Sequence, residues 1–372
     1  MSKRRANGEG CITKEASGRY RIIVSVWSGG KRVRKTRTAW KMADATAILN
    51  LMRAETNLFE HPHRLTVAKY LELWLRDTIV GERRENTDFS YRFAIKKHIN
   101  PRIGPILLRE LGPIHVQSFL AEMARDSVGS RTRENAFVVL RAAMKHAEVM
   151  KLITASPCDG ISKPKHVAAK MNPFTLEEAR LLLSDTVGHR FHALLQLALT
   201  AGLRQGELLG LSWKMIDWKK STVRVEQQAV SVQGETRIKP PKTGSSVRTV
   251  ELTADCLAAL QDHRAIMLAE GNLGNELVFP APEGGIEGRG NFRTRFWDPL
   301  LVKHGLAHRG FHNTRHTYAT LALGAGVPIP VVSSNLGHSK VSTTLDIYAH
   351  VLENHKTGAT ETVARLFASR VS

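Results

Sequence analysis

The sequence has 372 residues, with 54 lysines and arginines against 34 aspartates and glutamates, a formal net charge of +20. This length predicts two or three domains, and a hydrophobic content of 42% is enough for buried cores. The charge favours a polyanionic partner. No apolar run is long enough to cross a bilayer, and no apolar segment follows the basic start as in a secretory signal, so we expect no membrane partner. Cys11, Cys158 and Cys256 lie far apart and fit reduced thiols of a cytoplasmic protein.

Residues 1–60 are expected to form a small basic domain. The stretch "RYRIIVSVW" (19–27), a Ser-Gly-Gly turn and "KRVRKTRTA" (31–39) predict a hairpin, and a helical pattern begins near Met42. Twelve basic residues face two acidic ones in residues 1–41. A disordered basic tail is the alternative, but the alternation of Ile22, Val24 and Val26 favours a folded sheet. The candidate DNA contacts here are Arg19, Arg21, Arg32, Arg34 and Lys35.

Residues 65–160 are expected to be helical. Thr66 can cap a helix whose apolar residues, beginning at Val67, recur at i, i+3, i+4 and i+7. Further helices are predicted over about 87–99, ending before Pro101, and over about 133–149. Basic side chains on this bundle are either solvated charges or DNA contacts. The candidates are Arg92, Lys96, Arg131 and Arg133.

A basic stretch with proline near each end, "SKPKHVAAKMNP" (162–173), predicts a linker. Thr175 and Glu178 then form a capping box that opens a third domain, residues 174–350. The tail, residues 351–372, carries an apolar i, i+3, i+4 face beginning at Val363. That face could pack on a neighbouring protomer or on its own domain.

Four short segments of the third domain carry candidate chemistry. Arg204 lies between two apolar segments, so its charge must either form an ion pair or face a cleft. An ion pair with Glu207 alone could satisfy this charge. Lys242 falls in a turn-rich tip within residues 221–252, which otherwise alternate like strands. Asn313 can cap a helix that places Arg315 in its first turn, a favourable position for an anion, with His312 just before the cap.

The fourth segment follows Gly337, a predicted helix stop, and begins with His338. Ser342 can then cap a short helix that carries Tyr348. A rival interpretation is metal binding, because histidines recur every four residues from His304 to His316. Glycines interrupt any such helix, and no HExxH pattern or cysteine pair completes a site, so we expect no metal.

The motifs "TAGLRQGELLGLSW", "PKTGSSVRTV", "FHNTRHTYAT" and "LGHSKVSTTLDIYAHV" together resemble those of the tyrosine recombinases, the phage integrase family. The family often has aspartate where Asn313 stands. The resemblance is strong over residues 174–350, extends to a core-binding domain at 65–160, and is looser for an arm-binding domain at 1–60. It implies a multidomain, mainly α fold: a three-stranded sheet plus helix, a SAM-like helical bundle and a mixed α+β catalytic domain.

The resemblance also implies a mechanism without metal or cofactor. Arg204 and Arg315 would clamp the scissile phosphate, and His338 would donate a further hydrogen bond to it. Tyr348 would be the nucleophile, His312 its base and Lys242 the general acid, with Glu207 orienting the cluster. Paired arginine forks suit this chemistry because charge develops on the phosphate oxygens as the DNA is cut.

We therefore expect a site-specific recombinase, the integrase of a phage or integrative element, acting in the bacterial cytoplasm on the nucleoid. The expected partners are core-type and arm-type sites on double-stranded DNA, a homo-tetramer on that DNA, and a host DNA-bending protein and an excisionase. A chromosome-dimer resolvase or type IB-like topoisomerase would use the same chemistry. A catalytically inactive DNA-binding regulator is a further alternative, which the filled Arg204, Arg315 and Tyr348 positions argue against.

Overall fold

The computed structural model describes residues 10–28, 31–60, 64–79, 85–166, 171–232, 234–241 and 244–353. The chain divides into two compact units, residues 1–168 and 169–372. Among the described residues, no helix combines the length and the apolar character that a membrane span requires.

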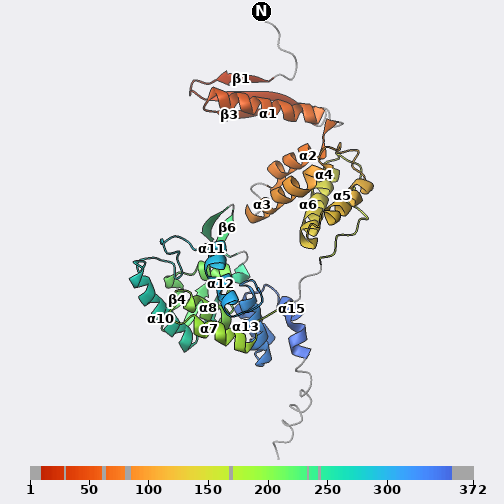
Figure 1. The fold of residues 1–372 in the computed structure, drawn as a ribbon. Coiled ribbons are helices and arrows are strands. Elements are labelled where there is room, and N and C mark those ends of the chain that lie inside the picture. The colour runs from red at the N-terminus through yellow and green to blue at the C-terminus, as the bar shows by residue number, and fades with distance from the viewer. Residues whose placement is uncertain are drawn as a thin grey trace, which may run out of the picture. The chain divides into compact units, whose positions relative to one another are not determined.

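The chain begins with a three-stranded antiparallel sheet, order β1-β2-β3, against which one helix packs (Figure 1). The elements are β1 (Cys11–Lys14), β2 (Tyr20–Ser28), β3 (Lys31–Ala39) and α1 (Met42–Glu60). Ile22 and Val24 are fully buried against Ala45 and Leu49 of the helix. The predicted hairpin is thus confirmed, although the side chain of Val26 lies outside the described residues.

A helical bundle follows, built around one apolar core. Its helices are α2 (Val67–Trp74), α3 (Glu85–Ala94), α4 (Asn100–Ile103), α5 (Pro113–Arg125) and α6 (Ser130–Val149), with π-helical turns at Leu75–Ile79 and Ile95–Ile99. Thr66 caps α2 as predicted, because its Oγ1 accepts a hydrogen bond from the Lys69 backbone N–H at 3.3 Å.

The prediction that helical structure stops before Pro101 is wrong. The π-helical turn inserts an extra residue, so that the backbone N–H of Asn100 donates to the carbonyl of Ile95. Pro101 then falls in the first turn of α4, where no N–H is needed for a helical bond. The helical path therefore runs on through Ile103.

The second unit is mixed α+β. Its helices are α7 (Leu176–Asp185), α8 (His192–Thr200), α9 (Gln205–Leu209), α10 (Ala254–Ala269), α11 (Arg289–Phe292), α12 (Asp298–Lys303), α13 (Asn313–Gly324), α14 (Ile329–Leu336) and α15 (Val341–Glu353). Its strands are β4 (Ile216–Asp217), β5 (Thr222–Val225), β6 (Gln228–Val232), β7 (Glu235–Lys239) and β8 (Arg248–Glu251). They form the antiparallel sheet β4-β5-β8 and the hairpin β6-β7. The Thr175–Glu178 capping box opens α7 as predicted.

Two apolar clusters hold this unit together. The larger packs α7, α8, α10 and the aromatic residues near Trp297 around the β4-β5-β8 sheet. The smaller joins α13, α14 and α15 through Ala319, Val332, Leu336 and Tyr348. The larger cluster therefore anchors α9, and the smaller one anchors α13 and α14.

Two predicted helix starts need correction. His312 occupies the N-cap position of α13, and Asn313 is its first residue, with an amide that donates to the Gly310 carbonyl at 3.0 Å. α15 begins at Val341, before Ser342, and has 13 residues rather than being short. The predicted stop at Gly337 is confirmed: it ends α14 with φ +62°, a conformation that favours glycine.

Candidate active site

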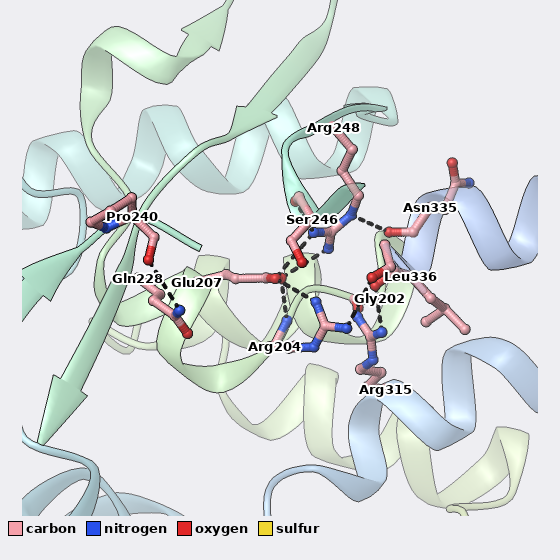
Figure 2. Close-up of polar contacts among 11 residues, drawn as sticks. Gly202, Arg204, Glu207, Gln228, Pro240, Ser246, Arg248, Arg315, Asn335 and Leu336 are labelled. Atoms are coloured by element: carbon pink, nitrogen blue, oxygen red, sulfur yellow. Dashed lines mark hydrogen bonds and ion pairs between the residues drawn. The ribbon is translucent and has the colours of Figure 1, made fainter. Parts of the chain in front are cut away.

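A buried carboxylate in the second unit binds two arginines, and a third arginine lies nearby (Figure 2). Glu207 of α9 is 3% exposed and accepts hydrogen bonds from the side chain and the backbone N–H of Arg204, both at 2.8 Å. Arg248 of β8 holds the same carboxylate through two nitrogens, at 2.8 and 3.0 Å. Burial alone would raise the pKa of Glu207, but the Arg248 hydrogen bonds and the charges of Arg248 and Arg204 bring it down to about 2.

The third arginine is held by backbone carbonyls instead of a carboxylate. Arg315 of α13 is 2% exposed and donates to the carbonyls of Gly202, at 2.8 Å, and Leu336. Arg204 reaches the adjacent Gly337 carbonyl at 3.2 Å. Burial, and then the charge of Arg204, lower the pKa of Arg315 to about 9, so it stays cationic at pH 7. Three guanidinium groups thus share one carboxylate, which leaves a surplus of positive charge.

Two histidines border this cluster. His338 follows α14, and its Nδ1 lies 2.9 Å from Thr344 Oγ1 of α15. Partial burial, and then the charges of Arg315 and Arg204, lower the pKa of His338 to about 4. Residue His312 is exposed overall. Desolvation of its ring, followed by the charges of His316 and Arg315, nevertheless lowers the pKa of His312 to about 4. Both rings are therefore neutral at pH 7.

Tyr348 lies on α15 with only 1% of its surface exposed. Its hydroxyl is 2.8 Å from Nδ1 of His316, one residue beyond Arg315. Burial raises the pKa of Tyr348 to about 12, with the charge of Arg315 acting in the opposite direction. Within the described part of the chain the hydroxyl makes no hydrogen bond to Arg204, Arg315, His312 or His338.

Five of the six residues predicted to carry the chemistry thus lie on, or directly beside, α9, α13, α14 and α15. The sixth, Lys242, lies outside the described residues, between β7 and β8. Most of the predicted tail, residues 354–372, also lies outside them.

Two residues of the cluster, Arg248 and His316, were not predicted from the sequence. Arg248 alternates with Val250 on the buried face of β8, and an arginine on an inward position of a strand is the signal that could have found it. From the sequence, His316 is only one of the histidines of the rejected metal interpretation. Its spacing of four residues from His312 puts both rings on one face of α13, where their centroids are 4.9 Å apart, edge to face.

The candidate DNA contacts of the first unit differ in their surroundings. Arg19 stacks over Trp40 at 4.3 Å, and Arg21 pairs with Glu15 at 2.5 Å. In the bundle, Arg92 pairs with Asp88 and Arg131 with Glu134, each at 2.8 Å. The exposed candidates are Arg19, Arg21, Arg34, Lys35, Arg92, Lys96 and Arg131, whereas Arg133 is partly buried and the side chain of Arg32 is outside the described residues.

The histidines of the rival metal interpretation do not converge. His304 lies 3.0 Å from Asp185, and His308 lies 3.3 Å from Asp298. In the part of the chain that the structure describes, no three histidine, cysteine, aspartate or glutamate side chains come close enough to hold a metal ion.

Residues 175–355 match the phage integrase family, and residues 66–124 match the phage integrase N-terminal SAM-like domain. A "Tyrosine recombinase XerC-like" protein of Caldanaerobacter subterraneus subsp. tengcongensis is 28% identical, covering 94% of this chain and 96% of that protein. An "Integrase" of Streptomyces ambofaciens is 27% identical, covering 94% of each chain.

Among solved structures, the Tn1549 transposon integrase in complex with transposon right end DNA shares the fold. Its TM-score is 0.69 at 21% identity, covering 81% of this chain and all of that chain. The fold and the matches together define a DNA strand-exchange enzyme. The chain belongs to the phage integrase family, the tyrosine recombinases, which cleave and rejoin DNA through a tyrosine intermediate.

Proposed function

We propose that this protein is the integrase of a phage or integrative element, that Tyr348 is its nucleophile, and that Arg204 and Arg315 clamp the scissile phosphate. The observation that carries the proposal is the surplus of positive charge beside Tyr348. Arg204, Arg248 and Arg315 share only one carboxylate, Glu207, among the described residues. A DNA phosphate would supply the missing negative charge.

The clamp would work because its arginines are fixed before DNA arrives. Arg315 is held by two carbonyls, and Arg204 by Glu207 and Gly337. Each guanidinium keeps further N–H groups for phosphate oxygens, since it carries five donors. Donors already in place stabilise the charge that grows on those oxygens without any reorganisation during the reaction.

The neighbouring groups would complete the reaction. His338, with Nδ1 engaged by Thr344, would offer its other ring nitrogen to a phosphate oxygen. His312, at the start of α13, would lie beside the same phosphate. Lys242 would protonate the departing 5′ oxygen as general acid. The product is a 3′-phosphotyrosyl ester, which a second 5′-hydroxyl can reverse onto a new strand.

The N-terminal sheet favours an integrase over a chromosome-dimer resolvase or a type IB-like topoisomerase. Arg34 and Lys35 lie exposed on β3, on a sheet with a folded core, as an additional DNA-binding surface would require. The domain boundaries would then be 1–60 for arm-type DNA, 65–160 for core-type DNA and 174–350 for catalysis. Exchange between two duplexes needs four strand cuts, which a homo-tetramer would provide. A DNA-bending protein and an excisionase would assist it on the nucleoid.

The test is strand exchange between two plasmids that carry the attachment sites of the element, with wild type and Tyr348→Phe compared. Wild type should give recombinants and a covalent protein–DNA adduct, whereas Tyr348→Phe should bind the same DNA and give neither. Recombination by Tyr348→Phe would refute the proposal. Nicking and relaxation by wild type without recombinants would favour a topoisomerase, and DNA binding without an adduct would favour an inactive regulator.

A further inference from the structure

We propose that His316 is a catalytic residue of this enzyme: its Nδ1 takes the proton from the Tyr348 hydroxyl as that oxygen attacks the phosphorus. This inference rests on the proposed role of Tyr348 as the nucleophile. It gives to His316 the part of proton acceptor that the sequence resemblance gave to His312.

The contact between the two side chains carries the proposal. His316 Nδ1 and the Tyr348 hydroxyl oxygen are 2.8 Å apart, within the reach required of a general base. The imidazole is on α13 and the phenol on α15, and the apolar cluster of α13, α14 and α15 fixes both helices. His312 makes no hydrogen bond to this hydroxyl; its ring meets His316 edge to face instead.

Water could take this proton only if it reached the hydroxyl. Tyr348 is 1% exposed, so bulk water is excluded from it. Across the described ranges, His316 is the only group that hydrogen-bonds this oxygen. A phenol enclosed in this way needs a protein base, because its pKa is raised, to about 12, rather than lowered.

His316 has the protonation state that a base needs. Burial, and then the charge of Arg315, lower the pKa of its imidazole below the usual value of 6.5. The ring is therefore neutral at pH 7, and its Nδ1 can hold a free lone pair toward the hydroxyl. The charged and titratable groups that face it are Tyr348 of α15, and His312 and Arg315 of its own helix.

The position beside Arg315 connects the base to the phosphate. Arg315 and His316 are consecutive in the first turn of α13, so the same turn would hold the phosphate and the proton acceptor. In the step, the Tyr348 O–H bond breaks and the proton moves to Nδ1. The phenolate oxygen forms a bond to phosphorus, and the bond from phosphorus to the 5′ oxygen breaks. In the reverse step, His316 returns the proton to the departing phenol.

The test measures the rate of covalent adduct formation with His316→Gln, which can still accept a hydrogen bond but is not a base. Two substrates separate the base from the general acid: a core-site duplex with the natural 5′ oxygen at the cut, and one with sulfur there, a leaving group that needs no proton. His308→Gln is the matched control, because His308 is exposed and pairs with Asp298 away from the cluster. Thermal unfolding and DNA binding establish that each variant is folded.

At pH 7 we expect His316→Gln to form adduct about 10²-fold or more slowly on both substrates, the usual contribution of a general base. Its rate should rise with pH, because the fraction of Tyr348 that is ionised without a protein base grows as pH approaches its pKa of about 12. The wild-type rate should fall as pH drops below 6.5, and that fall should be absent from His316→Gln.

An adduct rate at or above wild type in His316→Gln would overturn the proposal, because the hydrogen bond would then be a restraint on Tyr348. A slow variant that keeps the wild-type pH profile would also overturn it. If the proposed recombinase function were itself wrong, wild type would form no adduct on either substrate. That outcome is different from both results that would overturn the role of His316.

Discussion

At the scale of single residues, the site depends on the shape of arginine as much as on its charge. The Arg315 side chain uses two nitrogens to bind fixed carbonyls, and the Arg204 side chain uses two nitrogens to bind Glu207 and the Gly337 carbonyl. A lysine would keep the charge but could not both hold these positions and offer two parallel donors to a phosphate.

Arg204→Lys and Arg315→Lys should therefore lower the rate of strand cleavage by about 10²–10³-fold, the usual loss when one transition-state donor is removed. DNA affinity should change far less, since many other phosphate contacts remain. Single-turnover cleavage and gel-shift titrations measure the two quantities. Equal losses in both would mean that these arginines are ordinary backbone contacts.

Glu207 should make the thermal stability of the protein depend on pH in the acidic range. Its folded pKa is about 2, below the ordinary value of 4.5. The stabilisation from its charged form is thus fully present above pH 4.5 and is lost as pH falls through 2. Wild type should exceed Glu207→Gln in melting temperature at pH 7, and the gap should narrow between pH 4.5 and 2. A difference in melting temperature between wild type and Glu207→Gln that does not change with pH would contradict this account. The exposed variant Glu226→Gln is the control, and it should melt at the same temperature as wild type.

At the scale of elements, one buried side chain joins three of them. Arg248 of β8 binds Glu207 of α9 and also donates to the Asn335 carbonyl near the end of α14, at 2.5 Å. Gly337 packs against it, since a Cβ at that position would lie 3.0 Å from the Arg248 guanidinium. The loop that leads to His338 is therefore set by Arg248 as well as by its own helix.

Arg248→Met should destabilise the second unit by about 3–5 kcal/mol, because it leaves Glu207 as a buried charge without its main partner. Arg224→Met is the matched control on the adjacent strand: the Arg224–Glu226 pair is exposed and should be worth less than about 1 kcal/mol. Calorimetric unfolding measures both. Similar losses for the two variants would mean that the buried pair has no special role.

Local signals predicted the starts of α2 and α7 and the end of α14. Thr66 and Thr175 cap their helices through their own side chains, and the left-handed glycine at 337 ends α14. The π-helical turn before Pro101 could not be predicted, because the buried residues Ile95, Ile99 and Ile103 still recur every four residues, as in an ordinary α-helix. Nor could the pairing of Tyr348 with His316, which depends on how α13 and α15 pack.

At the scale of the whole molecule, the apolar cores of the N-terminal sheet, the helical bundle and the second unit belong to separate stretches of sequence. The core of the N-terminal sheet uses residues 22–52, and the bundle core begins at Leu65. Removal of residues 1–64 therefore leaves the apolar cores described for the later domains intact. The basic sheet can be tested for a role in DNA architecture without disturbing the proposed active site.

A fragment of residues 65–372 should fold, cut a core site and relax supercoiled DNA, yet fail at full integration. The salt dependence of its DNA binding should weaken, because fewer phosphates are neutralised. Integration assays and binding titrations over a range of salt measure these effects. If lower salt restores integration by the fragment to wild-type levels, the N-terminal sheet adds only nonspecific affinity, and the idea of a second DNA site is wrong.

The identity of the nucleophile is the central claim, and one measurement tests it directly. The enzyme is trapped on a pre-nicked core site, from which the 5′-hydroxyl strand is lost, and the adduct is digested with protease. Mass spectrometry of the DNA-linked peptide then locates the bond. We predict a 3′-phosphate ester on Tyr348, within α15. A bond at any other residue, or a full yield of adduct from Tyr348→Phe, would contradict the account.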